Sequence, residues 1–114
     1  MIKIIKIDEK DLKIQLKEIE DSLVSYYKEI KCVYIDTPLL ICPNTNKYMI
    51  ICDDEGMLDE RPIVYLQFGQ IIYGTMLICK VSNSGKTLSL NENDIEYLKK
   101  YLNEGVSFAK IISK

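Results

Sequence analysis

Short stretches of alternating hydrophobic and polar residues open the chain, which is the pattern of half-buried β-strands. Residues 2–7 are rich in β-branched side chains and predict a strand. After a polar turn, Leu12, Ile14 and Leu16 alternate with polar residues. This period of two predicts a second strand, paired with the first as a hairpin. A helix over residues 13–20 is the alternative interpretation.

Apolar runs further along the chain predict the rest of a sheet. Strands are expected at 32–35, 39–42, 48–52 and 71–81. The run at 48–52 is continuously apolar, which is typical of a central strand. Residues 63–68 fit either a strand or a short helix. Gly74 interrupts the last strand, and a glycine at such a place marks a bulge or a close approach of the backbone.

Helical spacing of apolar residues predicts a first helix after the hairpin. Asp21 is expected to cap it through the free N–H groups of the first turn, and the helix is expected to run to residue 30. The side chains predicted to form its apolar face are Leu23, Val24, Tyr27 and Ile30.

A second helix is predicted near the end of the chain. Asn91 is its expected N-cap, Leu90 and Ile95 have the spacing of a hydrophobic staple, and Gly105 is expected to end it. The residues predicted to face the core are Ile95, Leu98, Tyr101 and Leu102. Residues 106–112 fit either a last strand or a docking tail.

These elements predict an α+β fold. A mainly antiparallel sheet is expected, with two helices packed on one face. A chain of 114 residues is long enough for one hydrophobic core and too short for two. We therefore expect a single domain over residues 1–114.

Charge and cysteine content narrow the class of protein. The net charge is −2 with a single arginine, which argues against nucleic-acid binding, because base readout depends on bidentate arginine. The four cysteines form no C-x-x-C pair and the chain has no histidine, so no metal site and no cofactor is predicted. We expect free, buried thiols; a disulfide-stapled secreted domain is the alternative.

The ends and apolar runs of the chain predict its compartment. Residues 1–6 lack the apolar core and cleavage site of a signal peptide. No apolar run approaches the 18 or so residues that a membrane span needs, so no membrane partner is expected. Reduced cysteines then predict a cytoplasmic protein.

A block of unusual chemistry begins with the carboxylates of residues 53–55 and Gly56. Three adjacent carboxylates rarely converge on one cation, so a solvated turn is the simpler interpretation than a Ca²⁺ or Mg²⁺ site. No catalytic residue is predicted. Arg61 has the planar donor fork that suits a phosphate; a surface ion pair with Asp59 or Glu60 is its alternative role.

From 49 to 102 the chain resembles a family of small domains of unknown function that is widespread in phages and mobile elements. The residues that carry the resemblance are Asp-Asp-Glu-Gly at 53–56, Arg61-Pro62, Ile-Ile-Tyr-Gly-Thr at 71–75 and Leu-Ser-Leu-Asn-Glu-Asn-Asp-Ile at 88–95. Family members often have an asparagine shortly after the proline, where Val64 or Tyr65 stands in this chain. The resemblance implies a phage protein that acts in the host cytoplasm and interferes with host defence.

Together with the arginine and tyrosine content, the resemblance predicts a phage-type anti-defence protein that is not an enzyme. It is expected to bind and sequester a nucleotide-derived immune signal, such as a cyclic nucleotide or an ADP-ribose derivative. The predicted ligand-binding residues are Glu55, Arg61, Tyr65, Tyr73, Gly74 and Thr75. Arginine is expected to hold phosphate, tyrosines to stack on a base, and a homo-oligomer to share the pocket between chains.

Two other functions fit the same residues. The first is a protein–protein inhibitor of a bacterial defence effector, such as a CRISPR or restriction nuclease. The second is an enzyme that degrades the signal through Glu55 and its neighbours.

Overall fold

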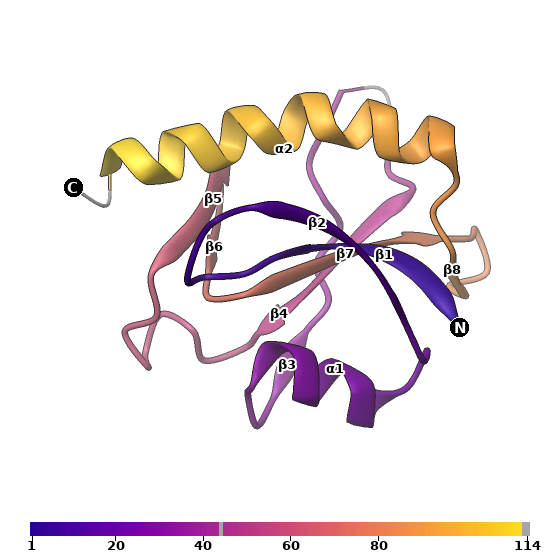
Figure 1. Ribbon diagram of the computed structural model, residues 1–114, viewed down its shortest axis with the longest axis horizontal. Coiled ribbons are helices and arrows are strands. Elements are labelled where there is room, and N and C mark those ends of the chain that lie inside the picture. The colour runs from indigo at the N-terminus through magenta and orange to yellow at the C-terminus, as the bar shows by residue number, and fades with distance from the viewer. Residues whose placement is uncertain (44, 113–114) are drawn as a thin grey trace.

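The computed structural model describes residues 1–43 and 45–112 (Figure 1). Its elements, in chain order, are β1 (Ile2–Ile7), β2 (Ile14–Ile19), α1 (Leu23–Ile30), β3 (Ile35–Asp36), β4 (Tyr48–Asp53), β5 (Ile63–Gln67), β6 (Gln70–Tyr73), β7 (Met76–Val81), β8 (Thr87–Leu88) and α2 (Glu92–Ile112). The main sheet has the order β2-β1-β7-β4-β3, with β8 paired to β7, and β5 and β6 form a separate hairpin. The strand pairs are antiparallel.

The central strands of the main sheet are buried on both faces. Ile50 and Ile78 belong to the apolar cluster that contains the inner face of α2, whereas Ile51 and Leu77 belong to the cluster that contains α1. Successive residues of a strand point to opposite faces, so a continuously apolar strand needs cover on both sides. Figure 1 shows α2 above the sheet and α1 below it. The α+β class and the mainly antiparallel sheet are confirmed, but the prediction that both helices pack on one face is wrong.

The predicted hairpin and the central strand are present. β1 pairs with β2 in a register that places Ile5 opposite Leu16, so the helical alternative for residues 13–20 is excluded. β4 lies inside the sheet, between β7 and β3. The stretch 63–68, which fitted a strand or a helix, contains strand β5.

The long strand predicted at 71–81 is two strands in different sheets. β6 pairs with β5, and β7 pairs with β1 and β4. The break falls at Gly74, whose φ of 84° is the left-handed conformation that glycine adopts without steric cost. The strands predicted at 32–35 and 39–42 are also wrong: β3 has only two residues, and the second stretch forms isolated bridges at Leu39 and Cys42.

The cap of α1 differs from the prediction by one residue. The Ser22 side chain accepts a hydrogen bond from the Ser25 N–H at 3.2 Å, which is the N-cap contact. Asp21 instead accepts a hydrogen bond from the Tyr26 hydroxyl.

The predicted buried face of α1 is confirmed only at Ile30. Tyr26 and Ile30, four residues apart, face the sheet, while Leu23 and Val24 are 58% and 76% exposed. A helix of eight residues allows two similar apolar faces, and the face that contains Tyr26 and Ile30 is the one that packs in the apolar cluster of the sheet.

α2 begins as predicted. The Asn91 side chain accepts from the Asp94 N–H and the Asp94 carboxylate accepts from the Asn91 N–H, both at 2.9 Å. This reciprocal pair satisfies two of the free donors at the helix start. Leu90 and Ile95 of the predicted staple are both buried.

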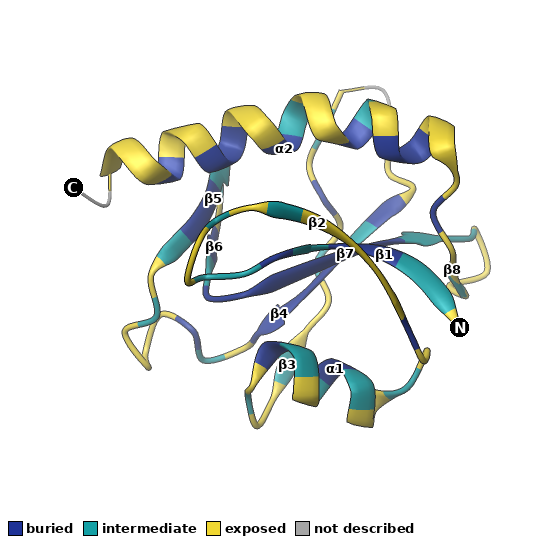
Figure 2. Ribbon diagram, in the orientation of Figure 1, coloured by how far each residue is buried: buried dark blue, intermediate teal, exposed yellow. Residues whose placement is uncertain are grey.

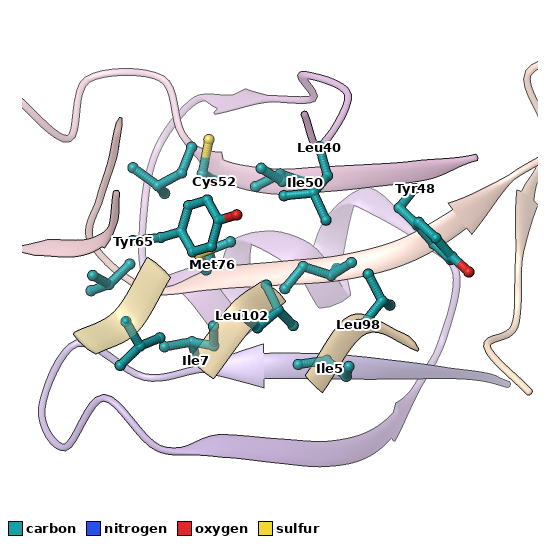
Figure 3. Close-up of a cluster of buried hydrophobic side chains, with 14 of the residues drawn as sticks. Ile5, Ile7, Leu40, Tyr48, Ile50, Cys52, Tyr65, Met76, Leu98 and Leu102 are labelled. Carbon is teal, nitrogen blue, oxygen red and sulfur yellow. The ribbon is translucent and has the colours of Figure 1, made fainter. Parts of the chain in front are cut away.

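α2 does not end at Gly105. The helix continues to Ile112, so neither a strand nor a tail follows the glycine. A Cβ atom at position 105 would overlap the ring of Tyr65, so the glycine allows β5 and α2 to pack closely. Figure 3 shows the Tyr65 ring inside the core cluster, near Leu102 of α2.

Burial follows this packing along α2. Figure 2 shows dark, buried segments where the helix faces the sheet and exposed segments on its outer side. The buried positions are Asp94, Ile95, Leu98, Leu102, Gly105, Val106 and Ala109. In the described part of the chain, no helix combines the length and apolarity that crossing a membrane requires.

We predict that Gly105→Ala destabilises the fold. Alanine raises helix propensity by about 1 kcal/mol, but the overlap of its Cβ with the Tyr65 ring is expected to cost more, about 2–3 kcal/mol for overpacking. Urea unfolding followed by circular dichroism measures the net loss. Asn103→Ala, at an exposed position of the same helix, serves as the control. An unchanged or raised midpoint for Gly105→Ala would contradict the packing role of this glycine.

Candidate functional site

Arg61 pairs with Asp53, one carboxylate of the block that the sequence singled out, and with Glu9 from the β1–β2 turn. Its side chain is 12% exposed and makes four hydrogen bonds. Nε and Nη2 donate to the Glu9 carboxylate, Nη1 donates to Asp53 at 2.9 Å, and Nη2 donates to the Ile30 carbonyl at 2.6 Å. Burial by itself would lower the pKa of Arg61, but the bonds to Glu9 and Asp53 raise it. The ion pair is therefore an internal one, and its partners are not Asp59 and Glu60.

Gly74 and Thr75 close around the same cluster. A Cβ atom at Gly74 would lie 2.5 Å from Arg61 Nε, so only glycine permits this approach. The Thr75 hydroxyl accepts from the Glu9 N–H at 3.2 Å and donates to the Glu9 carboxylate at 3.4 Å. The structure thus brings Arg61, Gly74 and Thr75 together, and the side chains of Arg61 and Thr75 both bond to the Glu9 carboxylate.

The other three predicted site residues, Tyr65, Glu55 and Tyr73, each have a different environment. Tyr65 is fully buried, and its hydroxyl donates to Gln67 at 3.3 Å, so its ring offers no open face. The Glu55 N–H donates to Asp53 at 2.9 Å, while Tyr73 is half-buried. A ligand-binding role for these six residues stays a prediction.

A concavity of about 370 Å³ lies beside Tyr73. Its lining includes the carboxylates of Asp36, Asp53 and Asp54. Across residues 1–43 and 45–112, no three His, Cys, Asp or Glu side chains are arranged to hold a metal ion. A cavity wall of carboxylates repels phosphate, so this place does not suit a nucleotide.

A row of four aromatic rings runs along one flank of α2. The ring centroids of Tyr48 and Tyr97 are 6.0 Å apart, those of Tyr97 and Tyr101 are 5.1 Å apart, and those of Tyr101 and Phe68 are 6.2 Å apart. Tyr97 and Tyr101 are neighbours because they are one helical turn apart. Three separate elements therefore supply one continuous set of rings.

Phe68 joins this row from the tip of the β5–β6 hairpin. Phe68 and Gly69 both have positive φ, at 52° and 75°, as a two-residue type I′ turn requires. Phenylalanine is strained in this conformation, and Phe68 is 46% exposed. The hairpin thus holds a large apolar side chain at the surface, next to Tyr101.

A groove of about 300 Å³ opens beside the tyrosines of this row. We name it the aromatic groove; its lining residues are Pro43, Thr45, Lys47, Tyr48, Asn93, Asp94, Tyr97 and Tyr101. The volume lies at the lower end of small-molecule sites, which suits a single ring system. Lys47 and Asn93 are exposed at its edge.

Hydrogen bonds hold the groove wall rigid. Asp94 accepts from the Tyr48 hydroxyl at 2.7 Å and from Lys80 at 3.3 Å. Burial would raise the pKa of Asp94, but the bonds from Asn91, Tyr48 and Lys80 outweigh it and lower the pKa. Burial and the bond to Asp94 raise the pKa of Tyr48. The carboxylate is therefore charged and the phenol is neutral at pH 7.

The hydroxyl of Tyr97 also forms a hydrogen bond. It donates to the Pro43 carbonyl at 2.6 Å, and burial, with the neighbouring Cys42 thiol, raises the pKa of Tyr97 to about 12. The edge of the ring is thus fixed by the loop, while the residue as a whole is only half-buried. This leaves ring surface for contact with a flat ligand.

Sequence reasoning found only part of the aromatic groove. It expected tyrosines to stack on a base, assigned Tyr101 to the core, and did not single out Tyr97 or Phe68. The signal for Tyr97 and Tyr101 was their spacing, which places both tyrosines on one helix face. The signal for the hairpin was Phe-Gly between two apolar runs.

Cysteine chemistry matches the expectation of free thiols. All four cysteines are free, with Cys52 and Cys79 buried and Cys32 and Cys42 half-buried. Burial raises the pKa of Cys52 and of Cys79 to about 12. These two thiols stay protonated and pack as small apolar side chains.

A family model described as Domain of unknown function (DUF3846) matches residues 2–103. The matched range contains the Arg61 cluster and all lining residues of the aromatic groove. Comparisons with curated proteins and with solved structures found no match.

We predict that Arg61→Lys lowers the free energy of unfolding by about 2 kcal/mol, and Arg61→Met by about 3–5 kcal/mol, because a buried ion pair is broken. Lysine keeps the charge but cannot reach Glu9, Asp53 and Ile30 together. Urea unfolding of both variants measures the loss. Lys28→Met, at an exposed position of α1, controls for removal of a surface charge. Wild-type stability of both Arg61 variants would contradict a structural role for the guanidinium.

We predict that Asp94 contributes to acid unfolding. Folding lowers the pKa of Asp94 below its ordinary value of 3.8. The stabilising effect of the charged carboxylate is therefore present above pH 3.8 and is lost as the pH falls below that value. Asp94→Asn should lower stability at pH 7 by about 1–2 kcal/mol. It should also flatten the dependence of stability on pH between about 5 and 2. Unfolding midpoints across this range test the effect, with Glu96→Gln at an exposed helix position as the control. Equal slopes in wild type and Asp94→Asn would contradict it.

Proposed function

The chain belongs to the family described as Domain of unknown function (DUF3846), and we propose that it binds and sequesters a small nucleotide-derived ligand in the aromatic groove. The observation that carries this proposal is the row of rings from Tyr48 through Tyr97 and Tyr101 to Phe68. Stacking on an aromatic side chain contributes about 1–3 kcal/mol per base and tolerates any base.

Polar groups around the rings fit the remaining parts of such a ligand. Lys47 lines the groove, and its ammonium forms no ion pair within the part of the chain that the structure describes. It is placed to meet a phosphate. The Asn93 amide offers both a donor and an acceptor for a base edge.

The groove supports binding better than catalysis. Asp94, its carboxylate, is engaged by Tyr48, Lys80 and the Asn91 N–H. A general acid or base needs a free position facing the substrate. We therefore propose a protein that holds its ligand intact.

In this proposal the ligand is a signal of bacterial defence, a cyclic nucleotide or an ADP-ribose derivative, and the protein is phage-type. The support is the resemblance of residues 49–102 to small domains of phages and mobile elements, together with a pocket of single-base size. Two chains joined as a homo-oligomer would extend this small groove to cover the rest of a nucleotide.

A protein–protein inhibitor of a defence effector is the second candidate. The observation in its favour is the number of exposed apolar side chains on α1 and on the loops near it. The most exposed of these are Leu23, Val24, Val33, Tyr34, Met57 and Leu58, from 58% to 76%. Exposed apolar surface of this kind marks protein contacts where it is contiguous.

We predict that Tyr97→Ala weakens ligand binding by about 5- to 150-fold, the equivalent of one lost stacking contact. Isothermal titration against cyclic nucleotides and ADP-ribose derivatives measures the affinity. Tyr97→Phe is the matched control, because it keeps the ring and removes only the hydroxyl bond to Pro43.

Two outcomes would contradict the proposal. One is the absence of binding across the whole panel; the other is equal loss in Tyr97→Phe and Tyr97→Ala. Native mass spectrometry of protein expressed with a defence system reports the oligomeric state and any retained ligand in one measurement.

A further inference from the structure

A second groove, of about 500 Å³, lies between α2 and the turn that joins β1 to β2. Its lining includes three lysines, of which Lys13 comes from the turn and Lys99 and Lys110 come from α2. Asn103 and Ser107 of the helix also face it. We name this concavity the lysine groove.

The lysine groove and the aromatic groove lie on opposite flanks of α2. Lys99, Asn103 and Ser107 recur every four residues and form one stripe of the helix. At about 100° per residue, this stripe lies on the other side of the core-facing residues from Tyr97 and Tyr101. The two grooves are therefore separate sites, and this inference does not depend on the proposed function of the aromatic groove.

The charge of the lysine groove is unbalanced. Its lining contains no carboxylate. Elsewhere in the described residues, Lys6, Lys17 and Lys80 form ion pairs, whereas the three groove lysines form none. This concentration of positive charge stands in a chain with a net charge of −2.

The helix dipole does not account for the three lysines. A cation is favoured in the last turn of a helix, which applies to Lys110 only. Lys99 lies in the middle of α2, and Lys13 lies on a different element. Like charges gathered in one concavity repel each other, and an anion between them relieves that repulsion.

We propose that the lysine groove binds a multiply charged phosphate group. The ammonium groups supply charge, and the Asn103 amide and Ser107 hydroxyl supply neutral donors for phosphate oxygens. Leu12 and Val106 add apolar walls, which lower the local dielectric and strengthen ion pairing. A free oligophosphate and the phosphate tail of a nucleotide share this chemistry.

The test is isothermal titration with sodium tripolyphosphate and, separately, with ATP, at low and at raised salt. Each of Lys13→Gln, Lys99→Gln and Lys110→Gln is expected to weaken tripolyphosphate binding about two- to fivefold, and the triple variant is expected to lose it. Raised salt should weaken binding further. Lys28→Gln, on the opposite side of the sheet, is the control and should bind as wild type does.

The outcomes distinguish a nucleotide phosphate tail from a free oligophosphate, and some of them would overturn the inference. ATP binding that depends on the three lysines and persists in Tyr97→Ala identifies a nucleotide phosphate tail at this groove. Binding of tripolyphosphate alone identifies a free oligophosphate. The inference is overturned if tripolyphosphate fails to bind at low salt, or if a triple variant with an unchanged circular dichroism spectrum binds it as well as wild type.

Discussion

The guanidinium of Arg61 is the interaction on which the arrangement of this protein depends. It joins the last carbonyl of α1, the end of β4 at Asp53 and the β1–β2 turn at Glu9. Removing a cation from water costs several kcal/mol, which is offset only when its donors are satisfied in good geometry. A planar fork of donors has fixed directions, so these segments are held in one relative position. Lysine, with a single charged centre on a flexible stem, could not fix the relative position of these segments.

The same cluster determines where the sheet divides. Gly74 lies against the Arg61 side chain, and its positive φ turns the chain between β6 and β7. Without that turn the apolar run from 71 to 81 would continue as one strand in the main sheet. Because it turns, the β5–β6 hairpin stands free of the sheet and packs on α2 through Tyr65. The hairpin tip then brings Phe68 to Tyr101, so the aromatic row depends on the ion cluster.

The sequence correctly predicted those features of the fold that depend on residues close together in the chain. The period of two in β1 and β2 and the reciprocal cap at Asn91 follow from neighbours in sequence. The errors came from tertiary contacts. Gly105 reads as a helix end until its approach to the Tyr65 ring is known, and Leu23 and Val24 read as a buried face until the packing of Tyr26 against the sheet is known. The aromatic groove was only partly predictable, because Tyr48 of β4 meets Tyr97 of α2 only in the folded chain.

The rotation of α2 about its own axis connects the core to both grooves. Gly105 against Tyr65 allows only one side of the helix to face the sheet. Since each residue advances the helix by about 100°, that contact also fixes which residues lie on the two flanks. Tyr97 and Tyr101 then face the loop that carries Thr45 and Lys47, while Lys99 and Lys110 face the turn that carries Lys13. A shift of α2 by one residue would turn both stripes away from their partners, so a packing contact with no exposed surface determines the chemistry of two exposed sites.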